Sequence, residues 1–284
     1  MSSTNIRWLP LVFGLITVGG LFLRGCQTGA FNRHQLLGLT PQQEAQLGDQ
    51  TYKQVLSQSE VVPRGPLVDK IREIGDRLAK ASQSEDVLKI TRLKRQQFSW
   101  EYNLVRSRQV NAFCLPGGKV VVYTGIVPVC QTEAGLATVM GHEIGHALAH
   151  HGAERMGQKQ VAAILQQSAW QSLGDMSPAQ REAVMGALNT GTQFGALLPF
   201  SRKHESEADH LGLLLMAAAG YDPRASVAFW KRMDQQSGGS KPLEFKSTHP
   251  SHEHRIRDLE GWLDEARLLY RKSQQQSDRA LPRS

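Results

Sequence analysis

The sequence is poor in cysteine and aromatic residues, and it carries no block of like charges. Three of its 284 residues are cysteines and 7% are aromatic. Cys114 and Cys130, each in an apolar stretch, either pair or remain buried thiols. The formal net charge is +7, but the lysines and arginines are spread along the chain. Binding to nucleic acid usually needs them clustered, so we predict no nucleic-acid partner.

Several motifs are missing as well. The chain contains no G-x-S-x-G nucleophile elbow and no phosphate-binding loop, which argues against a serine hydrolase of that type and against nucleotide chemistry. It shows no internal repeat and no sign of a second domain. The length permits a sizeable core. We therefore predict one domain over residues 27–272 and a polar C-terminal tail over 273–284.

The one long apolar run lies at the N-terminus. The sixteen residues from Trp8 to Leu23 are uncharged and follow the cation Arg7. They are few for a membrane-spanning helix, which needs about 20, but they suit a signal peptide or signal anchor. The run ends in LRGC, which resembles a bacterial lipobox with Cys26 as the lipidated residue, although Arg24 departs from that pattern. We predict a lipoprotein signal over residues 1–26, with an uncleaved membrane anchor and an ordinary secretion signal as alternatives.

Apolar periodicity and capping signals predict the helices and strands. Thr40, Pro41 and Gln43 form a capping box that begins a helix, and the alternation in FSWEYNLV predicts a strand. Helices are expected at 40–57, 67–78, from 132, 154–173, from 177, 201–220, from 222 and 251–272, strands at 98–105, 109–115 and 119–125, and a tether at 27–39. This order predicts a mostly helical α+β fold with a small antiparallel sheet next to the helix from 132.

The stretch VMGHEIGHALAHHG gathers four of the ten histidines on a predicted helix. His142 and His146 are four residues apart, so their side chains share one helical face, with Cβ atoms about 5–6 Å apart. Two imidazoles so placed can bind one zinc ion, and Glu143 beside them can act as base toward a water molecule. Gly141 and Gly145 each cost about 1 kcal/mol of helix stability relative to alanine, which indicates that another element packs very close.

A catalytic zinc site has three protein ligands and one open position, so a third ligand is needed. The metzincin pattern would place it shortly after His146, but Ala149 and Gly152 occupy the required positions. The stretch SRKHESEADHLG instead offers Glu205 and Asp209, four apart on one predicted helix. We predict Glu205 as the third ligand and Asp209 as the acceptor of a ligating histidine's free ring N–H. A solvated acidic face is the alternative.

The other polar residues of these two helices are expected at the surface. His150 shares a face with His146, but the helix dipole favours a solvated cation near a helix C-terminus, and His151 is interpreted in the same way. The residues predicted at the surface or rim of the second helix are His204, Glu207 and His210.

Four stretches match one known family. They are H-E-x-x-H followed by E-x-x-x-D, NAFCLPGG, STHPSHEHRI and the upstream LTPQQEAQLG. Together they resemble the membrane-associated gluzincin family of the CAAX prenyl endopeptidase, HtpX and the mitochondrial overlapping-activity protease, and above all its small single-domain bacterial envelope members. The chain departs from the family at Cys114, where a small residue is usual, and it has neither the multi-spanning region of HtpX nor tetratricopeptide repeats.

The resemblance implies a zincin-type metalloprotease with one Zn²⁺ per chain. The ligands are then His142, His146 and Glu205, Asp209 supports a ligand, and Glu143 is the general base.

The resemblance also implies how substrate is held. Asn111, Ala112 and Phe113 correspond to the family's edge strand, along which an extended polypeptide would add as a further strand. His249 and Arg255 would stabilise the transition state. In a second role, His249 would bind the zinc as a fourth ligand and keep the enzyme latent. The alternative for the strand with Asn111 to Phe113 is an ordinary sheet strand. For His249 it is a loop residue, and for Arg255 it is a surface cation.

These expectations describe a zinc endopeptidase that cleaves membrane or envelope proteins in protein quality control. Its expected location is the bacterial cell envelope, attached to the membrane by a lipid or by the N-terminal anchor, with the catalytic domain outside the cytoplasm. A zinc-dependent periplasmic chaperone or scaffold with latent protease activity is the main alternative, although Glu143 argues against it, since a structural metal needs no base. Another H-E-x-x-H hydrolase, such as a deformylase, lacks its further motifs here.

Overall fold

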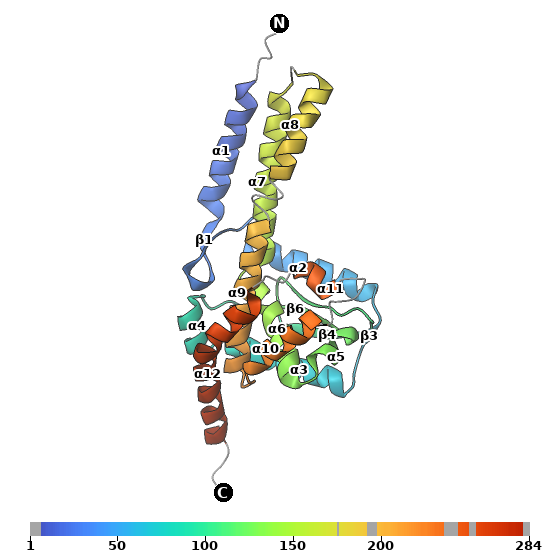
Figure 1. Ribbon diagram of the computed structural model, residues 1–284, viewed down its shortest axis with the longest axis vertical. Coiled ribbons are helices and arrows are strands. Elements are labelled where there is room, and N and C mark those ends of the chain that lie inside the picture. Colours follow the sequence, from blue (N-terminus) through green and yellow to red (C-terminus); the bar gives the residue numbers. More distant parts are fainter. Residues whose placement is uncertain (1–6, 175, 192–197, 236–243, 250–253, 281–284) are drawn as a thin grey trace.

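The computed structural model describes residues 7–174, 176–191, 198–235, 244–249 and 254–280 of the chain (Figure 1). Helices pack around one small sheet, and three helices project from this body to one side. The projecting helices are α1 (Trp8–Gly25), α7 (His151–Ser172) and α8 (Pro178–Gly191). The mostly helical α+β fold predicted from the sequence is confirmed.

The sheet has the strand order β3-β4-β6-β5 and is mixed. Its strands are β3 (Val61–Val62), β4 (Glu101–Val105), β5 (Ala112–Leu115) and β6 (Lys119–Tyr123). β5 and β6, which correspond to two of the predicted strands, pair as an antiparallel hairpin. β6 lies between β5 and β4 in the sheet and runs parallel to β4. The prediction of a purely antiparallel sheet was therefore wrong. β5 is left at one edge of the described sheet.

The two helices that carry the predicted metal ligands pack against each other. They are α6 (Glu133–Leu148), which Thr132 caps through Gly135 N–H, and α9 (Leu198–Ala218). A Cβ atom added at Gly141 would lie 3.0 Å from the carbonyl oxygen of Gly212, and one at Gly145 would lie 3.0 Å from that of Ala208. The close neighbour predicted from these two glycines is therefore α9.

The remaining helices surround this pair and the sheet. The capping box at Thr40 is present, with Gln43 N–H donating to Thr40 Oγ1 and Gln43 Oε1 accepting from Thr40 N–H. The remaining helices of the body are α2 (Pro41–Ser57), α3 (Pro66–Ser82), α4 (Glu85–Thr91), α5 (Val127–Cys130), α10 (Arg224–Gln235), α11 (Glu244–Thr248) and α12 (Arg255–Ala280). The largest apolar core joins α3, α6, α9, α10 and α12 to one face of the sheet.

Two sequence-based boundaries change. The last helix continues to Ala280, beyond the expected end near 272, while its expected start at 251 lies outside the described residues. Residues 27–39 are not a tether. They form a hairpin of β1 (Cys26–Thr28) and β2 (His34–Leu36) with a short 3-10 turn, η1 (Ala30–Asn32), between the strands. A second 3-10 turn, η2 (Thr124–Ile126), follows β6.

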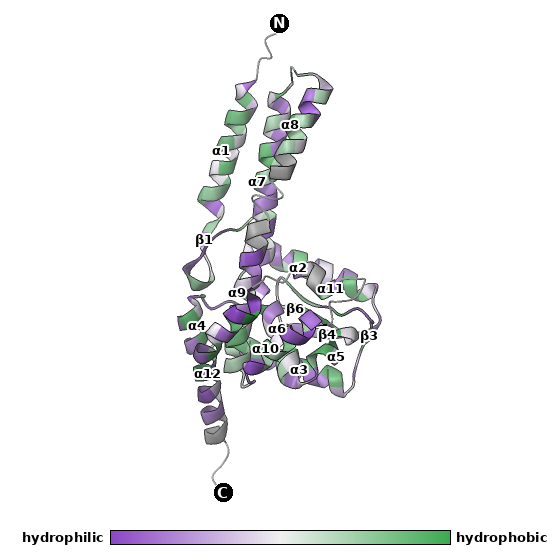
Figure 2. Ribbon diagram, viewed as in Figure 1, coloured by the Kyte–Doolittle hydropathy of each residue, from purple (hydrophilic) through white to green (hydrophobic). Residues whose placement is uncertain are grey.

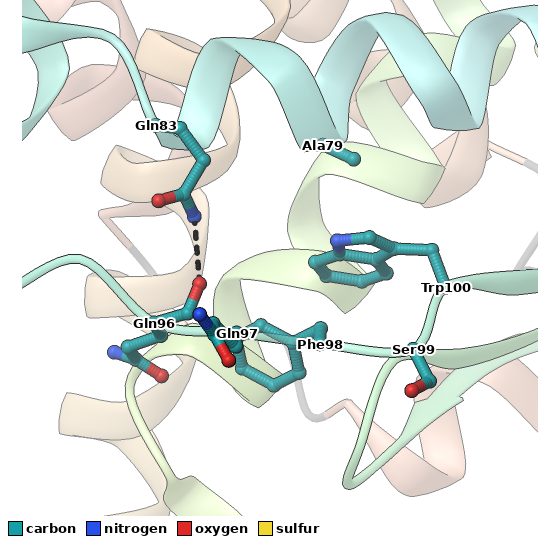
Figure 3. A pocket seen from close by; sticks show the side chains of 7 residues that line it. All are labelled: Ala79, Gln83, Gln96, Gln97, Phe98, Ser99 and Trp100. Atoms are coloured by element: carbon teal, nitrogen blue, oxygen red, sulfur yellow. Dashed lines mark hydrogen bonds between the residues drawn. The ribbon is translucent and has the colours of Figure 1, made fainter.

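The three cysteines form no disulfide bond: Cys26, Cys114 and Cys130 are all free thiols. A hollow of about 710 Å³ lies between α3 and the segment before β4. Figure 3 shows the residues that line it, which are Ala79, Gln83, Gln96, Gln97, Phe98, Ser99 and Trp100. The predicted metal ligands do not line this hollow, so it has no part in the site described below.

Candidate metal centre

Four side chains from three parts of the chain converge on one point. His142 and His146 come from α6, Glu205 from α9, and His249 from the residue after α11. The Nε2 atoms of the two α6 histidines are 3.1 Å apart, and each lies 3.4 Å from an oxygen of Glu205. His249 Nδ1 lies 3.2 Å from His142 Nε2 and 3.2 Å from both Glu205 oxygens.

These spacings fit a tetrahedral zinc site. Zinc–nitrogen bonds of about 2.0–2.1 Å place neighbouring ligand atoms roughly 3.3 Å apart. His142 Nδ1 lies 2.9 Å from Asp209 Oδ1, to which its ring N–H donates, so Nε2 carries a lone pair. His146 Nδ1 lies 2.8 Å from another ring nitrogen, His151 Nδ1. If the Nδ1–H group of His146 donates to His151, His146 Nε2 also carries a lone pair. The lone pairs of His146 Nε2 and His142 Nε2 then face each other across 3.1 Å, and a cation between them removes their repulsion.

The carboxylate of the third ligand is ionised. Burial raises the pKa of Glu205, but the hydrogen bonds with His142 and His249 and the electrostatic effect of the His146 ring outweigh burial and hold that pKa well below its usual range. Glu205 Oε2 also accepts a hydrogen bond from Arg255 Nη2 at 3.0 Å. The centre offers two imidazole nitrogens and one carboxylate, which is a donor set that zinc prefers.

Arg255 is buried beneath the ligands. Its Nε donates to Asp209 Oδ2 at 2.7 Å, and its guanidinium lies 3.9 Å from the centre of the Trp230 ring. One arginine therefore holds both the ligand Glu205 and the residue that orients His142. Such hydrogen-bond partners of the metal ligands fix the orientation of the ligating imidazole rings and the basicity of the ligands.

Glu143 lies beside the centre, next to His249. Its Oε1 atom is buried, makes no hydrogen bond within the described residues, and lies 3.3 Å from His249 Nε2. Burial raises the pKa of Glu143, and a backbone hydrogen bond of Cys114 in β5 lowers it in part. A carboxylate with a raised pKa is a suitable general base near neutral pH.

Comparison with known families identifies the chain. The model of peptidase family M48 matches residues 71–263, which contain α6, β5 and the whole ligand cluster. The chain belongs to peptidase family M48. It is therefore a metalloendopeptidase with a zinc site formed by His142, His146 and Glu205.

Relatives of this M48 chain occur in mitochondria and bacteria. The mitochondrial metalloendopeptidase OMA1 of Schizosaccharomyces pombe is 36% identical over 269 residues, covering 90% of this chain and 73% of the relative. OMA1 of Saccharomyces cerevisiae is 31% identical, with 96% and 79% covered. The beta-barrel assembly-enhancing protease of Escherichia coli is 30% identical over 234 residues, with 80% and 45% covered.

The structure places the remaining predicted residues of the M48 site as follows. Ala112 is buried and Asn111 and Phe113 are half-buried, in or beside the edge strand β5. Cys26 is exposed at the start of β1. Arg255 is not the surface cation that was the alternative to a functional role, because it is buried with two carboxylates.

Several residues interpreted as surface groups prove to be buried beside the centre. His151 is the first residue of α7, and its Nε2 lies 3.1 Å from Glu207 Oε2. Burial lowers the pKa of His151 well below its usual value, so the ring is neutral. With His151 Nδ1 as acceptor and Nε2–H as donor, hydrogen bonds run from His146 through His151 to Glu207. His151, His204 and Glu207 were wrongly predicted at the surface or rim, because the position of a residue on a helix does not reveal which other segment covers that face.

The cover comes from the N-terminal hairpin. Arg33, between η1 and β2, donates to Glu207 at 2.6 Å and to both oxygens of Glu154 at 2.7 and 2.8 Å. Glu154 also lies 3.1 Å from His204, whose ring stacks on His151. Burial raises the pKa of Glu154, but His204 and Arg33 lower it to about 2. This buried ionic cluster closes the chain of hydrogen bonds that begins at the ligand His146.

The cluster leads to a prediction for zinc affinity. His151→Ala removes the acceptor that orients His146, so zinc affinity should fall by about 10–100-fold, as is typical when an outer partner of a ligand is lost. His151→Gln should restore part of it, because an amide can accept and donate in the same places. The measurement is competition with a chromophoric zinc chelator.

The matched control for His151 is its neighbour. His150 has a left-handed backbone (φ 55°) and bonds Glu44 at 2.7 Å instead of a ligand, and asparagine tolerates that backbone. His150→Asn should bind zinc like the wild type. Equal affinity in His151→Ala and His150→Asn would show that His146 needs no such partner.

Proposed function

We propose that this M48 metalloendopeptidase cleaves membrane or envelope proteins in protein quality control. The observation that carries the proposal is the buried Glu143 carboxylate, which lies between the zinc ligands and the edge strand β5 without a hydrogen-bond partner for Oε1 among the described residues. A purely structural metal site has no use for such a group. The named relatives, a mitochondrial endopeptidase and a bacterial assembly-enhancing protease, make a membrane-related quality-control role the best-supported one.

The chain's own residues account for the proton transfers. His142, His146 and Glu205 would hold the zinc, which would supply a Lewis acid for the attacking water and the scissile carbonyl. Glu143 takes the proton of the attacking water at Oε1 and delivers it to the nitrogen of the leaving amine. His249 Nε2 lies near enough to this carboxylate, at 3.3 Å, to donate to the oxyanion that forms beside it. Arg255 positions Glu205 and Asp209 and does not touch substrate.

The substrate backbone is expected to pair with β5. This strand is an edge of the described sheet, and its Cys114 backbone hydrogen-bonds Glu143. An extended segment added at the edge obtains main-chain hydrogen bonds that do not depend on its sequence. The Asn111–Phe113 stretch would thus bring a peptide bond close to Glu143 while tolerating many substrates, as a quality-control protease must.

The site as described is also compatible with latency. His249 Nδ1 occupies a ligand position next to Glu205 and His142, where a fourth ligand would displace the attacking water. α11 holds it there, since Phe245 N–H donates to Val110 O beside β5 and the Phe245 ring packs 4.7 Å from His249. This observation favours the second function, a chaperone with latent protease activity, as a resting state of the same protein.

His249→Ala separates these roles. If His249 holds the enzyme latent, the variant should cleave casein faster than the wild type and lose zinc faster to a small chelator. If His249 only stabilises the oxyanion, kcat should fall by about 10²–10³ with unchanged metal affinity. His254→Ala, an exposed histidine nearby, is the control. A variant equal to wild type in rate, zinc affinity and chelator response would remove both roles.

The function itself is tested on the full chain purified in detergent. Metal analysis should find one zinc per chain, and casein cleavage should stop with a chelator and return when zinc is added back. Cleavage that survives complete metal removal would refute zinc proteolysis. Stoichiometric zinc without cleavage, in both wild type and His249→Ala, would favour the chaperone function.

Membrane attachment and location complete the proposal. The apolar helix α1 is long and apolar enough to cross a membrane, by length and composition only. We place the catalytic domain at a bacterial envelope membrane and outside the cytoplasm, on the apolar N-terminal segment and on the location that the likeness to envelope members implies. Replacing Cys26 by serine should abolish palmitate labelling if the cysteine is lipidated, whereas an unlabelled wild type that stays with membranes would favour the uncleaved anchor.

A further inference from the structure

We propose that α1 is retained in the mature protein and that α1, α7 and α8 embed together in a lipid bilayer. The membrane contact would then be a three-helix arm rather than a lipid group or a lone anchor. The inference is independent of the proteolytic function, because the metal centre lies in the body of the molecule and not in the arm (Figure 1).

The first argument is the fit between α1 and α7. The two helices run antiparallel along their length (Figure 1). At the far end, Arg7 N–H donates to Ser172 O at 3.1 Å. Midway, Gly14 is buried, and a Cβ atom there would lie 2.1 Å from Ser168 Oγ. A signal peptide that is later removed, or a helix that merely tethers the domain, has no need for a fitted neighbour.

The second argument is what the arm leaves exposed. α1 is almost entirely uncovered apart from its contact with α7, with 6% of its apolar window buried. A core helix of a soluble protein would be mostly buried, and large contiguous apolar surfaces mark contacts with membranes or proteins. Figure 2 shows the apolar colouring along α1. The exposed large apolar side chains of the arm are Trp8, Leu9, Val12, Phe13, Leu15, Ile16, Phe22, Leu23, Leu165, Trp170 and Val184.

The third argument is the order of charge and aromatic residues along the arm. α1 has no charge from Trp8 to Leu23, and α7 has none from Gln160 to Ser172. The 18 residues of α1 measure about 27 Å at 1.5 Å each, close to the roughly 30 Å of a bilayer's hydrocarbon core. Arg24, Arg155 and Lys159 mark the end next to the catalytic body.

The far end carries the residues expected at a membrane–water interface. Trp8 and Trp170 are both exposed there, and the Arg181 guanidinium lies 4.8 Å from the centre of the Trp170 ring. Arg181 also donates to Gly174 O, beside the Arg7 guanidinium. Tryptophans with adjacent cations are typical of the headgroup level. An uncharged belt between two charged ends fits a bilayer better than it fits a protein partner.

The polar residues of α7 explain why the arm must act as a unit. Ser168 satisfies its hydroxyl on Ile164 O, but Gln167 and Gln171 are exposed amides within the uncharged belt. Amides in hydrocarbon are costly, so α7 alone is too polar to insert. Packed against the far more apolar α1, α7 can enter the bilayer together with it. Membrane insertion of α7 should therefore depend on its contact with α1.

The experiment uses the full chain with Cys26→Ser, reconstituted into phosphatidylcholine–phosphatidylglycerol vesicles. A fluorophore is attached at Leu165→Cys on α7 or, as control, at Leu47→Cys on α2, two leucines of similar exposure (37% and 41%). Mid-chain spin-labelled lipid should quench the probe at 165 at least twofold more than the probe at 47, and aqueous iodide should show the reverse. Each labelled chain then receives one further substitution. Gly14→Leu clashes with Ser168, whereas Gly19→Leu lies where a Cβ atom meets nothing within 4 Å.

Gly14→Leu should abolish the lipid quenching at 165, and Gly19→Leu should keep it, although both add the same apolar bulk to α1. Iodide quenching at 165 equal to that at 47 in the parent chain would overturn the bilayer contact. Identical behaviour of the two glycine variants would overturn the three-helix unit. The intact mass of the unsubstituted protein isolated from membranes gives its first residue. A mass that corresponds to a chain starting at residue 26 would overturn the retention of α1.

Discussion

Glu143→Gln should retain its zinc and lose cleavage by a factor of about 10²–10⁴, the usual contribution of a general base. The amide has nearly the same shape as the carboxylate and can still accept the backbone hydrogen bond of Cys114 in the edge strand. It cannot take a proton from water. Because Glu143 is not among the clustered ligand atoms, the metal content should not change.

The control for this variant is on the same helix. Glu133 lies in the first turn of α6, is half-exposed and pairs with Lys70 at 3.0 Å. Glu133→Gln should cleave casein at the wild-type rate, since an exposed pair of this kind contributes little. Measuring zinc content and initial rates on all three proteins gives the comparison. Near wild-type cleavage by Glu143→Gln would mean that another group is the base.

Glu205→Ala should lose more zinc affinity than the roughly 10–100-fold typical of an outer partner, because it removes one of three ligands. Asp209→Ala, which removes only the acceptor for His142, should fall within that range. Both carboxylates pair with the buried Arg255, and breaking a buried pair is destabilising. Thermal melts must therefore accompany the metal titrations.

Glu205→Gln protects this prediction against simple misfolding. The amide still accepts from Arg255 Nη2, so the variant should stay folded while it loses the negative charge that zinc requires. A folded Glu205→Gln chain that binds zinc as tightly as the wild type would place the third ligand elsewhere. His249, which lies 3.2 Å from the Glu205 oxygens, would then be the first residue to test.

The sequence revealed the parts of the site that depend on local spacing. Four-residue intervals place His142 with His146 and Glu205 with Asp209 whatever surrounds them, and the glycines in α6 indicated a close neighbour. The sequence could not reveal the cluster around Arg33, because its partners Glu154 and Glu207 are 121 and 174 positions away. The strand order failed for the same reason, since insertion of β6 beside β4 depends on pairing across the fold.

The backbone contact of α6 with α9 has a consequence for the tolerance of the site to substitution. A Cβ atom at Gly212 would lie 2.7 Å from His142 N, and one at Gly141 or Gly145 would lie 3.0 Å from an α9 carbonyl oxygen. Any side chain there pushes the helices apart by tenths of an ångström, which is comparable to the roughly 0.2 Å tolerance of metal–ligand bonds. The absence of a side chain at these three glycines therefore sets the distance between α6 and α9, and with it the spacing of the metal ligands. Loss-of-function alleles in such a protein need not touch a single ligand, and some of them would be conservative replacements of glycine by alanine.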